Sequence, residues 1–166
     1  MTADDDSLVT VIGVSIVSGT GTRLVIDCSS QSASVNNEVR TATVLPLGDS
    51  ITNGGNSRPS YRRELWHKLE QAGYNVDFIG SENSFFGNGP PVSEQDFDLD
   101  HEGHWAQEAG FVADNIDTWL VGYTPDIVIM HLGTNDFERG QSISSTLTEF
   151  EQIFESLRED NPLSLF

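Results

Sequence analysis

Hydrophobic and polar positions change their pattern at Thr41. From there to the end, short apolar runs alternate with stretches in which apolar residues recur at helical spacing. The runs predict strands and the stretches predict helices. The predicted strands cover 42–47, 76–79 and 127–132, and the predicted helices cover 61–72, 106–120 and 145–159. Alternating strands and helices are typical of an α/β fold with a parallel sheet.

Residues 1–40 have a different texture, rich in Ser, Thr, Val and Gly. Two apolar runs, 8–17 and 24–26, flank a Ser/Thr/Gly stretch, which predicts either a β-hairpin-like appendage or the tail of an upstream module. The run over 8–17 is too short to span a bilayer and follows three aspartates instead of basic residues, so no signal peptide is visible. We therefore expect an appendage or linker over 1–40 before a second unit over 41–166.

The net charge of the chain limits the classes of partner that it can bind. The 166 residues include 26 acidic and 8 basic side chains, a formal net charge of −18. Such a chain repels phosphate backbones and anionic membrane surfaces, so we expect no nucleic acid and no membrane partner. Cys28 is the only cysteine, which excludes an intrachain disulfide and a cysteine-based metal cluster.

Candidate chemistry follows the three predicted strands, at the sheet edge where α/β proteins place their sites. The first strand leads into Gly48-Asp49-Ser50, the second into Gly80 and the third into Gly133-Thr134-Asn135-Asp136. A serine hydroxyl in a tight turn can act as a nucleophile, and an amide or a bare backbone N–H can stabilise an oxyanion. Each residue alone also fits a helix cap, an Asx turn or a strand-ending turn.

Together, these segments resemble a known superfamily. Residues 44–52 (VLPLGDSIT), Gly80 and residues 133–136 (GTND) resemble the first three sequence blocks of the SGNH (GDSL) hydrolases, over about residues 41–166. Three further stretches are similar to acetylxylan esterases of carbohydrate esterase family 3. They are residues 61–66 (YRRELW), 77–81 (DFIGS) and 101–105 (HEGHW).

The resemblance implies a fold and a set of roles. The fold is a flavodoxin-like three-layer α/β/α sandwich with a parallel sheet. Ser50 is the implied nucleophile, and the N–H groups of Ser50 and Gly80 with the Asn135 amide are the implied oxyanion hole. Asp49 braces the turn. The implied protein is a secreted serine esterase that needs no cofactor or metal and acts on an acetylated polysaccharide or a small ester.

One element of the family pattern is missing from these residues. The family's catalytic histidine, with an aspartate three residues before it, belongs to a fourth block, and no Asp-x-x-His follows Asn135. An oxyanion hole without a base leaves only ~10³–10⁴ of rate enhancement, so we expect these 166 residues alone to be nearly inactive. We also expect an incomplete sheet that leaves 127–132 as an open edge and favours self-association.

The four histidines and an acidic run leave alternatives open. His67 is expected near the surface and His131 inside a buried strand, whereas His101 and His104 lie in a long loop near Ser50. These two are candidates for a replacement base, for bracing the loop or for contacting substrate.

Metal binding is the weaker interpretation of the same loop. The spacing of its two histidines is not that of a zinc peptidase. Asp96, Asp98 and Asp100 alternate as at the start of a calcium loop, but His101 and Gln107 occupy the positions that need glycine and glutamate, so a solvated acidic loop is expected. Two other functions remain open for the whole chain, an inactive or glycan-binding pseudo-enzyme and an SGNH lipase or thioesterase.

Overall fold

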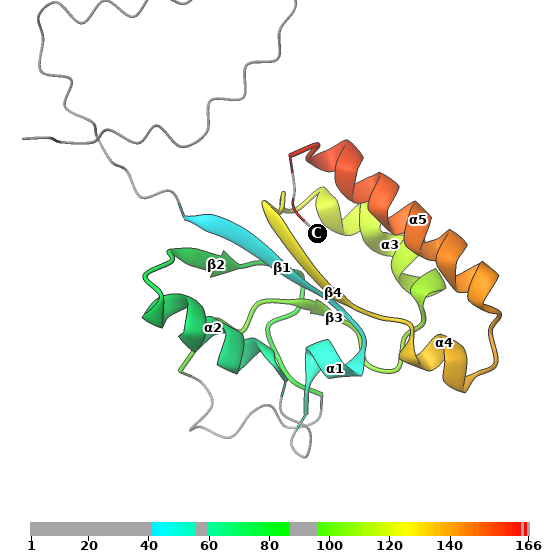
Figure 1. Cartoon of the computed structure of the whole chain (residues 1–166), viewed down its shortest axis with the longest axis horizontal. Helices are drawn as coiled ribbons and strands as arrows, with labels where there is room; N and C mark the ends of the chain where they lie inside the picture. The colour runs from blue at the N-terminus through cyan, green and yellow to red at the C-terminus, as the bar shows by residue number, and fades with distance from the viewer. Residues whose placement is uncertain (1–40, 56–59, 87–95, 164, 166) are drawn as a thin grey trace, which may run out of the picture. The chain divides into compact units, whose positions relative to one another are not determined.

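The computed structural model describes residues 41–55, 60–86, 96–163 and 165 (Figure 1). The predicted appendage over 1–40 lies outside them. The elements along the chain are β1 (Ala42–Gly48), α1 (Ser50–Asn53), α2 (Arg62–Gln71), β2 (Val76–Phe78), β3 (Glu102–Gly103), α3 (Ala109–Leu120), β4 (Ile127–His131), α4 (Thr134–Glu138) and α5 (Ile143–Asp160).

The sheet is built around β1, and every pairing in it is parallel. On one side, β4 pairs with β1 from Val44 to Gly48. On the other side, β2 pairs with the first half of β1, and β3 pairs with its last two residues. The carboxyl ends of β1, β3 and β4 therefore meet at one edge of the sheet, where the loops that follow them begin (Figure 1).

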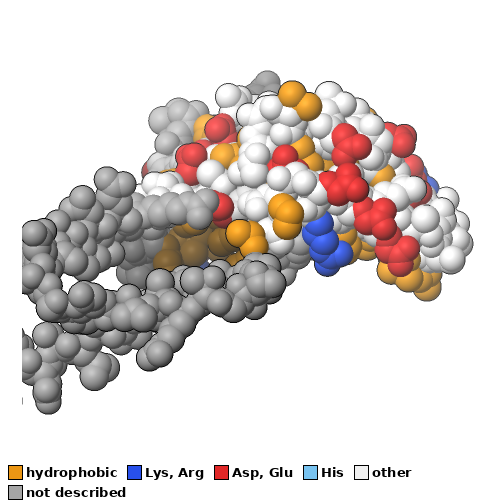
Figure 2. Space-filling view, turned by 90° about the horizontal axis from the view of Figure 1, so that it is seen from above, with side chains coloured by type: hydrophobic (Ala, Val, Ile, Leu, Met, Phe, Trp, Pro, Cys, Tyr) orange, Lys and Arg blue, Asp and Glu red, His pale blue; other side chains and the backbone are white. Residues whose placement is uncertain are grey.

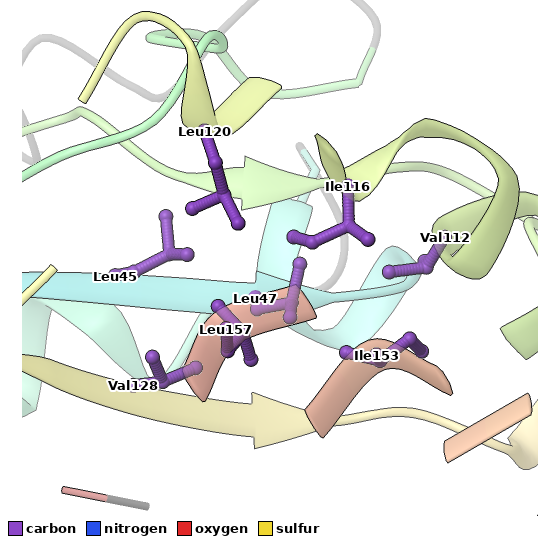
Figure 3. Packing of buried hydrophobic residues seen from close by; sticks show 8 residues of the cluster. All are labelled: Leu45, Leu47, Val112, Ile116, Leu120, Val128, Ile153 and Leu157. Carbon is purple, nitrogen blue, oxygen red and sulfur yellow. The ribbon is translucent and has the colours of Figure 1, made fainter. Parts of the chain in front are cut away.

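Helices cover both faces of the sheet (Figure 1). Alternate side chains of β1 point to opposite faces, so that Leu45 and Leu47 lie in a cluster with α3 and α5. The other residues of this cluster are Val112, Ile116, Leu120, Val128, Ile153 and Leu157 (Figure 3). On the opposite face, α2 packs Trp66 edge-on against Phe78 of β2, with ring centroids 5.1 Å apart. This arrangement confirms the predicted α/β sandwich.

The structure adds three short elements that the pattern did not predict. They are α1, β3 and α4, each of five residues or fewer. The long loop predicted over 81–104 contains β3. An isolated antiparallel bridge joins Glu82, near the start of this loop, to His101, near its end. His131 is exposed at the end of β4, so the expected buried position is wrong: the strand reaches the sheet edge at this residue.

The described surface reflects the acidic composition. Asp and Glu side chains cover more of the face in Figure 2 than Lys and Arg side chains do. Within the described ranges, no helix combines the length and the apolar character needed to cross a membrane.

Candidate active site

Ser50 is the first residue of α1, directly beyond the carboxyl end of β1. The turn requires glycine at position 48, because a Cβ there would lie 2.2 Å from the His131 carbonyl oxygen and 2.5 Å from the Thr52 hydroxyl. Ser50 is half-buried. Among the residues that the structure describes, none forms a hydrogen bond with its hydroxyl, which leaves this group available for chemistry.

Asp49 is fully buried and shapes the turn that presents Ser50. Its Oδ1 accepts a hydrogen bond of 2.9 Å from the Ile51 N–H, and thereby caps the start of α1. Its own N–H donates to the His131 carbonyl at 3.4 Å. Asp49 therefore ties the Ser50 turn to the end of β4.

Asn135 lies in α4, just after the end of β4. Because β4 pairs with β1 up to Gly48, Asn135 and Ser50 leave neighbouring strands at the same edge of the sheet. The Asn135 Nδ2 donates one hydrogen bond, of 2.8 Å, to the Gln107 carbonyl. A side-chain amide has two N–H groups, so the second remains available for an oxyanion while the first holds the side chain in place.

Gly80 sits at a different level of the sheet from Ser50. It follows β2, whose last pairing places Phe78 opposite Val44, in the first half of β1. A Cβ at Gly80 would lie 2.1 Å from the His101 carbonyl oxygen, so glycine is needed here for close backbone packing. The strand that ends beside Gly48 is β3, which the sequence pattern did not reveal. The role of Gly80 in an oxyanion hole stays a prediction. It was based on the expectation that the strand before Gly80 ends level with the strand before Ser50, and the pairing of β2 with the first half of β1 differs from this.

Ala106, in the loop after β3, has an unusual backbone conformation. Its φ of 60° is the one positive φ of a non-glycine residue within the described ranges. Arg139 donates to the Ala106 carbonyl at 2.7 Å, and Asn135 holds the next carbonyl, that of Gln107. Backbone strain of this kind is concentrated at functional sites. In the part of the chain that the structure covers, the Ala106 N–H makes no hydrogen bond, so it is a candidate oxyanion donor.

His101 is a buried structural residue. Its Nε2 lies 2.7 Å from the Ser84 carbonyl, and its Nδ1 accepts from the Gly103 N–H at 2.9 Å, so both ring nitrogens are occupied. Burial, with Arg62 nearby, lowers the pKa of His101 to about 3. Of the roles left open for this histidine, the geometry fits bracing of the loop.

His104 is partly buried and pairs with the fully buried Glu102. The His104 Nε2 lies 2.5 Å from a carboxylate oxygen of Glu102, and the imidazole stacks on Trp119 of α3 with ring centroids 4.5 Å apart. Tyr123 donates a hydrogen bond to the same carboxylate, as do the hydroxyl and N–H groups of Ser81. Burial would raise the pKa of Glu102, but these hydrogen bonds outweigh it and hold the pKa below its ordinary value.

Arg62 holds the other end of α1. Its guanidinium is fully buried and donates to the carbonyls of Thr52 at 2.9 Å, Asn53 at 3.0 Å and Leu99 at 2.6 Å. The charge lies over the Phe85 ring, 4.9 Å from its centroid. Burial lowers the pKa of Arg62 to about 10. This residue therefore clamps the last carbonyls of the Ser50-bearing helix, a role that the sequence analysis missed.

The acidic run does not form a metal site in the described residues. Asp96 makes a two-pronged ion pair with Arg63, at 2.7 and 2.8 Å. Asp98 instead accepts from the N–H groups of Phe78 and Asp100. No group of three or more acidic, histidine or cysteine side chains in these ranges is arranged to hold a metal ion. The aspartates stabilise the connection to β3.

Sequence reasoning also missed the role of Asp136. This side chain is fully buried and accepts from the Ala109 N–H at 3.0 Å, so it caps α3 from a distant part of the chain. The sequence pattern predicted that this helix begins at residue 106. The cap by Asp136 explains why α3 begins at Ala109 instead. Its only signal in the sequence was its place beside Asn135.

Comparisons with known proteins connect this geometry to a family. Residues 47–164 match the model of the GDSL-like lipase/acylhydrolase family. A multidomain esterase of Ruminococcus flavefaciens is 31% identical over 137 residues, which cover 74% of this chain and 18% of that protein.

Solved structures agree with this match. A carbohydrate esterase family 3 protein from Talaromyces cellulolyticus has a TM-score of 0.64 and 35% identity, over 75% of this chain and 60% of that one. An acetyl esterase, crystallised as a serine-to-alanine mutant with an acetate ion, has a TM-score of 0.63 and 35% identity, over 74% of this chain and 58% of that one. The chain thus spans about three fifths of these solved relatives. The resemblance to SGNH hydrolases and to carbohydrate esterase family 3 is confirmed.

Proposed function

Because the chain belongs to the GDSL-like lipase/acylhydrolase family, we propose that it carries the nucleophile and oxyanion donors of a serine esterase that removes O-acetyl groups from carbohydrate. The observation that carries this proposal is the position of Ser50 and Asn135 at the ends of the paired strands β1 and β4. The half-buried Ser50 hydroxyl has no hydrogen-bond partner in the described residues. It lies at the same sheet edge as the Asn135 amide, which uses one of its two N–H groups to bind the Gln107 carbonyl.

The proposed reaction is acyl transfer in two steps. The Ser50 oxygen attacks the acetyl carbonyl and gives its proton to a base, which returns it to the departing sugar oxygen. Water then attacks the acetyl-serine and releases acetate. The base in the family pattern is the histidine of an Asp-x-x-His block, a motif not found between Asn135 and Phe166.

Three donors are proposed for the oxyanion. The N–H of Ser50 and the free N–H of the Asn135 amide are two of them, and removing one such donor typically slows kcat by about 10²–10³. For the third we favour the N–H of Ala106 over that of Gly80. Ala106 follows the strand that ends beside Gly48. Arg139 donates to the Ala106 carbonyl and Asn135 donates to the Gln107 carbonyl, so the backbone that follows this N–H is held in place.

An acetylated sugar is the proposed substrate because relatives at about 35% identity are a carbohydrate esterase and an acetyl esterase. The neutral substrate also suits a chain with a net charge of −18. A second candidate is a pseudo-enzyme that binds glycan without cleaving it.

The test is acetate release from acetylated xylo-oligosaccharide by the protein in the form that its gene encodes. The proposal predicts release that Ser50→Ala reduces by at least about 10³-fold. Binding without release points to the pseudo-enzyme, and faster cleavage of long-chain esters points to a lipase. A His104→Ala variant tests the replacement base: unchanged activity with an unchanged pH profile excludes His104 from that role.

A further inference from the structure

An aromatic stack stands beside the end of the helix that carries Ser50. The rings of Phe86 and Trp105 lie nearly parallel, with centroids 4.2 Å apart and an interplanar angle of 16°. Phe86 is 55% exposed although it is a large hydrophobic residue. An exposed ring that is held flat against a second ring offers an aromatic surface to a ligand, and nothing in the acyl-transfer scheme uses it.

Backbone contacts fix this stack to the helix that carries Ser50. The Phe86 N–H donates to the Asn53 side chain at 2.8 Å and to the Gly54 carbonyl at 3.0 Å. The Gly54 N–H in turn donates to the Ser50 carbonyl at 2.9 Å. Trp105 lies over Gly55, where an added Cβ would be only 3.4 Å from the indole ring. The stack is therefore held against the end of the helix whose first residue is Ser50.

Polar groups share a pocket with the stack. A cavity of about 290 Å³ is lined by both rings together with Glu82, Ser84 and Asn53. In the ranges that the structure describes, the Glu82 carboxylate and the Ser84 hydroxyl have no hydrogen-bond partner, so both can bind a ligand. The volume lies at the lower end of ligand pockets, which are ~300–1,000 Å³, and suits a single ring better than a long chain.

We propose that this pocket is a sugar subsite that binds a neutral pyranose ring of the substrate chain. An aromatic face matches the apolar C–H face of a sugar ring, and a carboxylate and a hydroxyl match its hydroxyl groups. A fatty acyl chain would leave Glu82 and Ser84 desolvated without partners, and an anionic sugar would be repelled by Glu82. The subsite rests on the proposed esterase function, because it places the sugar of that same reaction.

Binding can be measured without turnover, by calorimetric titration of unacetylated xylotetraose into the protein. Phe86→Ala is expected to weaken binding by about tenfold, and Glu82→Gln by about threefold. Phe86→Tyr keeps the ring and retains the affinity, which guards against an unfolded variant. Tyr74→Ala is the matched control, since Tyr74 is 65% exposed but lines a different groove, and it leaves binding unchanged.

The outcomes separate this subsite from the esterase proposal. In Phe86→Ala, KM for acetylated xylotetraose should rise by about tenfold, a larger change than in the hydrolysis of 4-nitrophenyl acetate, which has no sugar. Xylotetraose binding that is absent, or equal in Phe86→Ala and the unaltered protein, overturns the subsite. Sugar binding that depends on Phe86 in a protein without Ser50-dependent hydrolysis overturns the esterase proposal and leaves a glycan-binding site.

Discussion

The backbone N–H of His104 donates a hydrogen bond of 2.8 Å to the carbonyl oxygen of Gly48, two residues before Ser50. This contact fastens the end of β3 to the end of β1. It brings the loop with Trp105 and Ala106 to the same sheet edge as Ser50. The arrangement of the candidate site therefore depends on a two-residue strand, and on the buried side chains that hold it and the adjacent α1 in place.

Arg62 should be among the most sensitive positions for stability. Arg62→Met removes the donor of the buried carbonyls of Thr52 and Asn53 and of the partly buried carbonyl of Leu99, and should cost about 3 kcal/mol in the free energy of unfolding. Urea denaturation measures this loss. Its neighbour provides the control, because Arg63 is partly exposed and pairs with an exposed aspartate, so Arg63→Met should cost far less. Equal losses for the two variants would refute the clamp.

His101 should make the protein lose stability in acid. The fold keeps this side chain neutral down to about pH 3, whereas the unfolded chain takes up a proton below about pH 6.5. The contribution of the neutral His101 side chain to the free energy of unfolding is complete above about pH 6.5. It is lost as the pH falls from there, at about 1.4 kcal/mol per pH unit.

Urea denaturation of the unaltered protein and of His101→Gln over about pH 4–7 tests this linkage. The variant lacks the histidine, so the stability difference between the two proteins should shrink toward acid pH. A difference that stays constant across this range would show that His101 does not titrate as described.

The strained backbone at Ala106 predicts a stabilising substitution. A left-handed φ costs an L-residue roughly 1–2 kcal/mol, while glycine costs about 0.5–1 kcal/mol in unfolded-chain entropy. Ala106→Gly should therefore leave stability equal or raise it by up to about 1.5 kcal/mol, as measured by thermal denaturation. Ala109→Gly, a buried helical position nearby, should lower stability. A clear loss in Ala106→Gly would mean that its methyl group is needed for packing.

The edge of β4 should promote self-association. Beyond the bridge of Ile127 to Leu165, the outer side of this strand has no paired strand among the described residues. An open edge with apolar side chains such as Ile129 is a template for pairing with another chain. Sedimentation velocity should show concentration-dependent association that Ile129→Lys reduces. A monodisperse monomer that unfolds cooperatively would contradict the expectation.

Hydrophobic periodicity was sufficient to predict the main frame of the fold. The strands at 42–47 and 127–132 and the helix at 61–72 match β1, β4 and α2 within a residue or two, because the apolar residues of each recur at the spacing of its element. A strand as short as β3 has no such recurrence. Its Glu102 side chain is polar and is buried because His104, Tyr123 and Ser81 all hydrogen-bond to the carboxylate in the folded chain.

The sequence pattern could predict the positions of those candidate site residues that directly follow a strand. Ser50 and Asn135 lie where the pattern placed them, at adjacent strand ends. The assignment of Gly80 assumed that the second predicted strand ends level with the first, a matter of register that no local pattern encodes. The clamp by Arg62 was equally invisible, since its partners at Thr52 and Leu99 meet it only in the folded chain.

The most direct test of the central claim is the site of a covalent adduct with a phosphonate ester, which traps an activated serine nucleophile. The protein in the form that its gene encodes is treated with the reagent, digested and mapped by mass spectrometry. We predict a single phosphonylated peptide that contains Ser50 and disappears in Ser50→Ala. An adduct on another residue, or one that persists in Ser50→Ala, would contradict the assignment of Ser50 as the nucleophile.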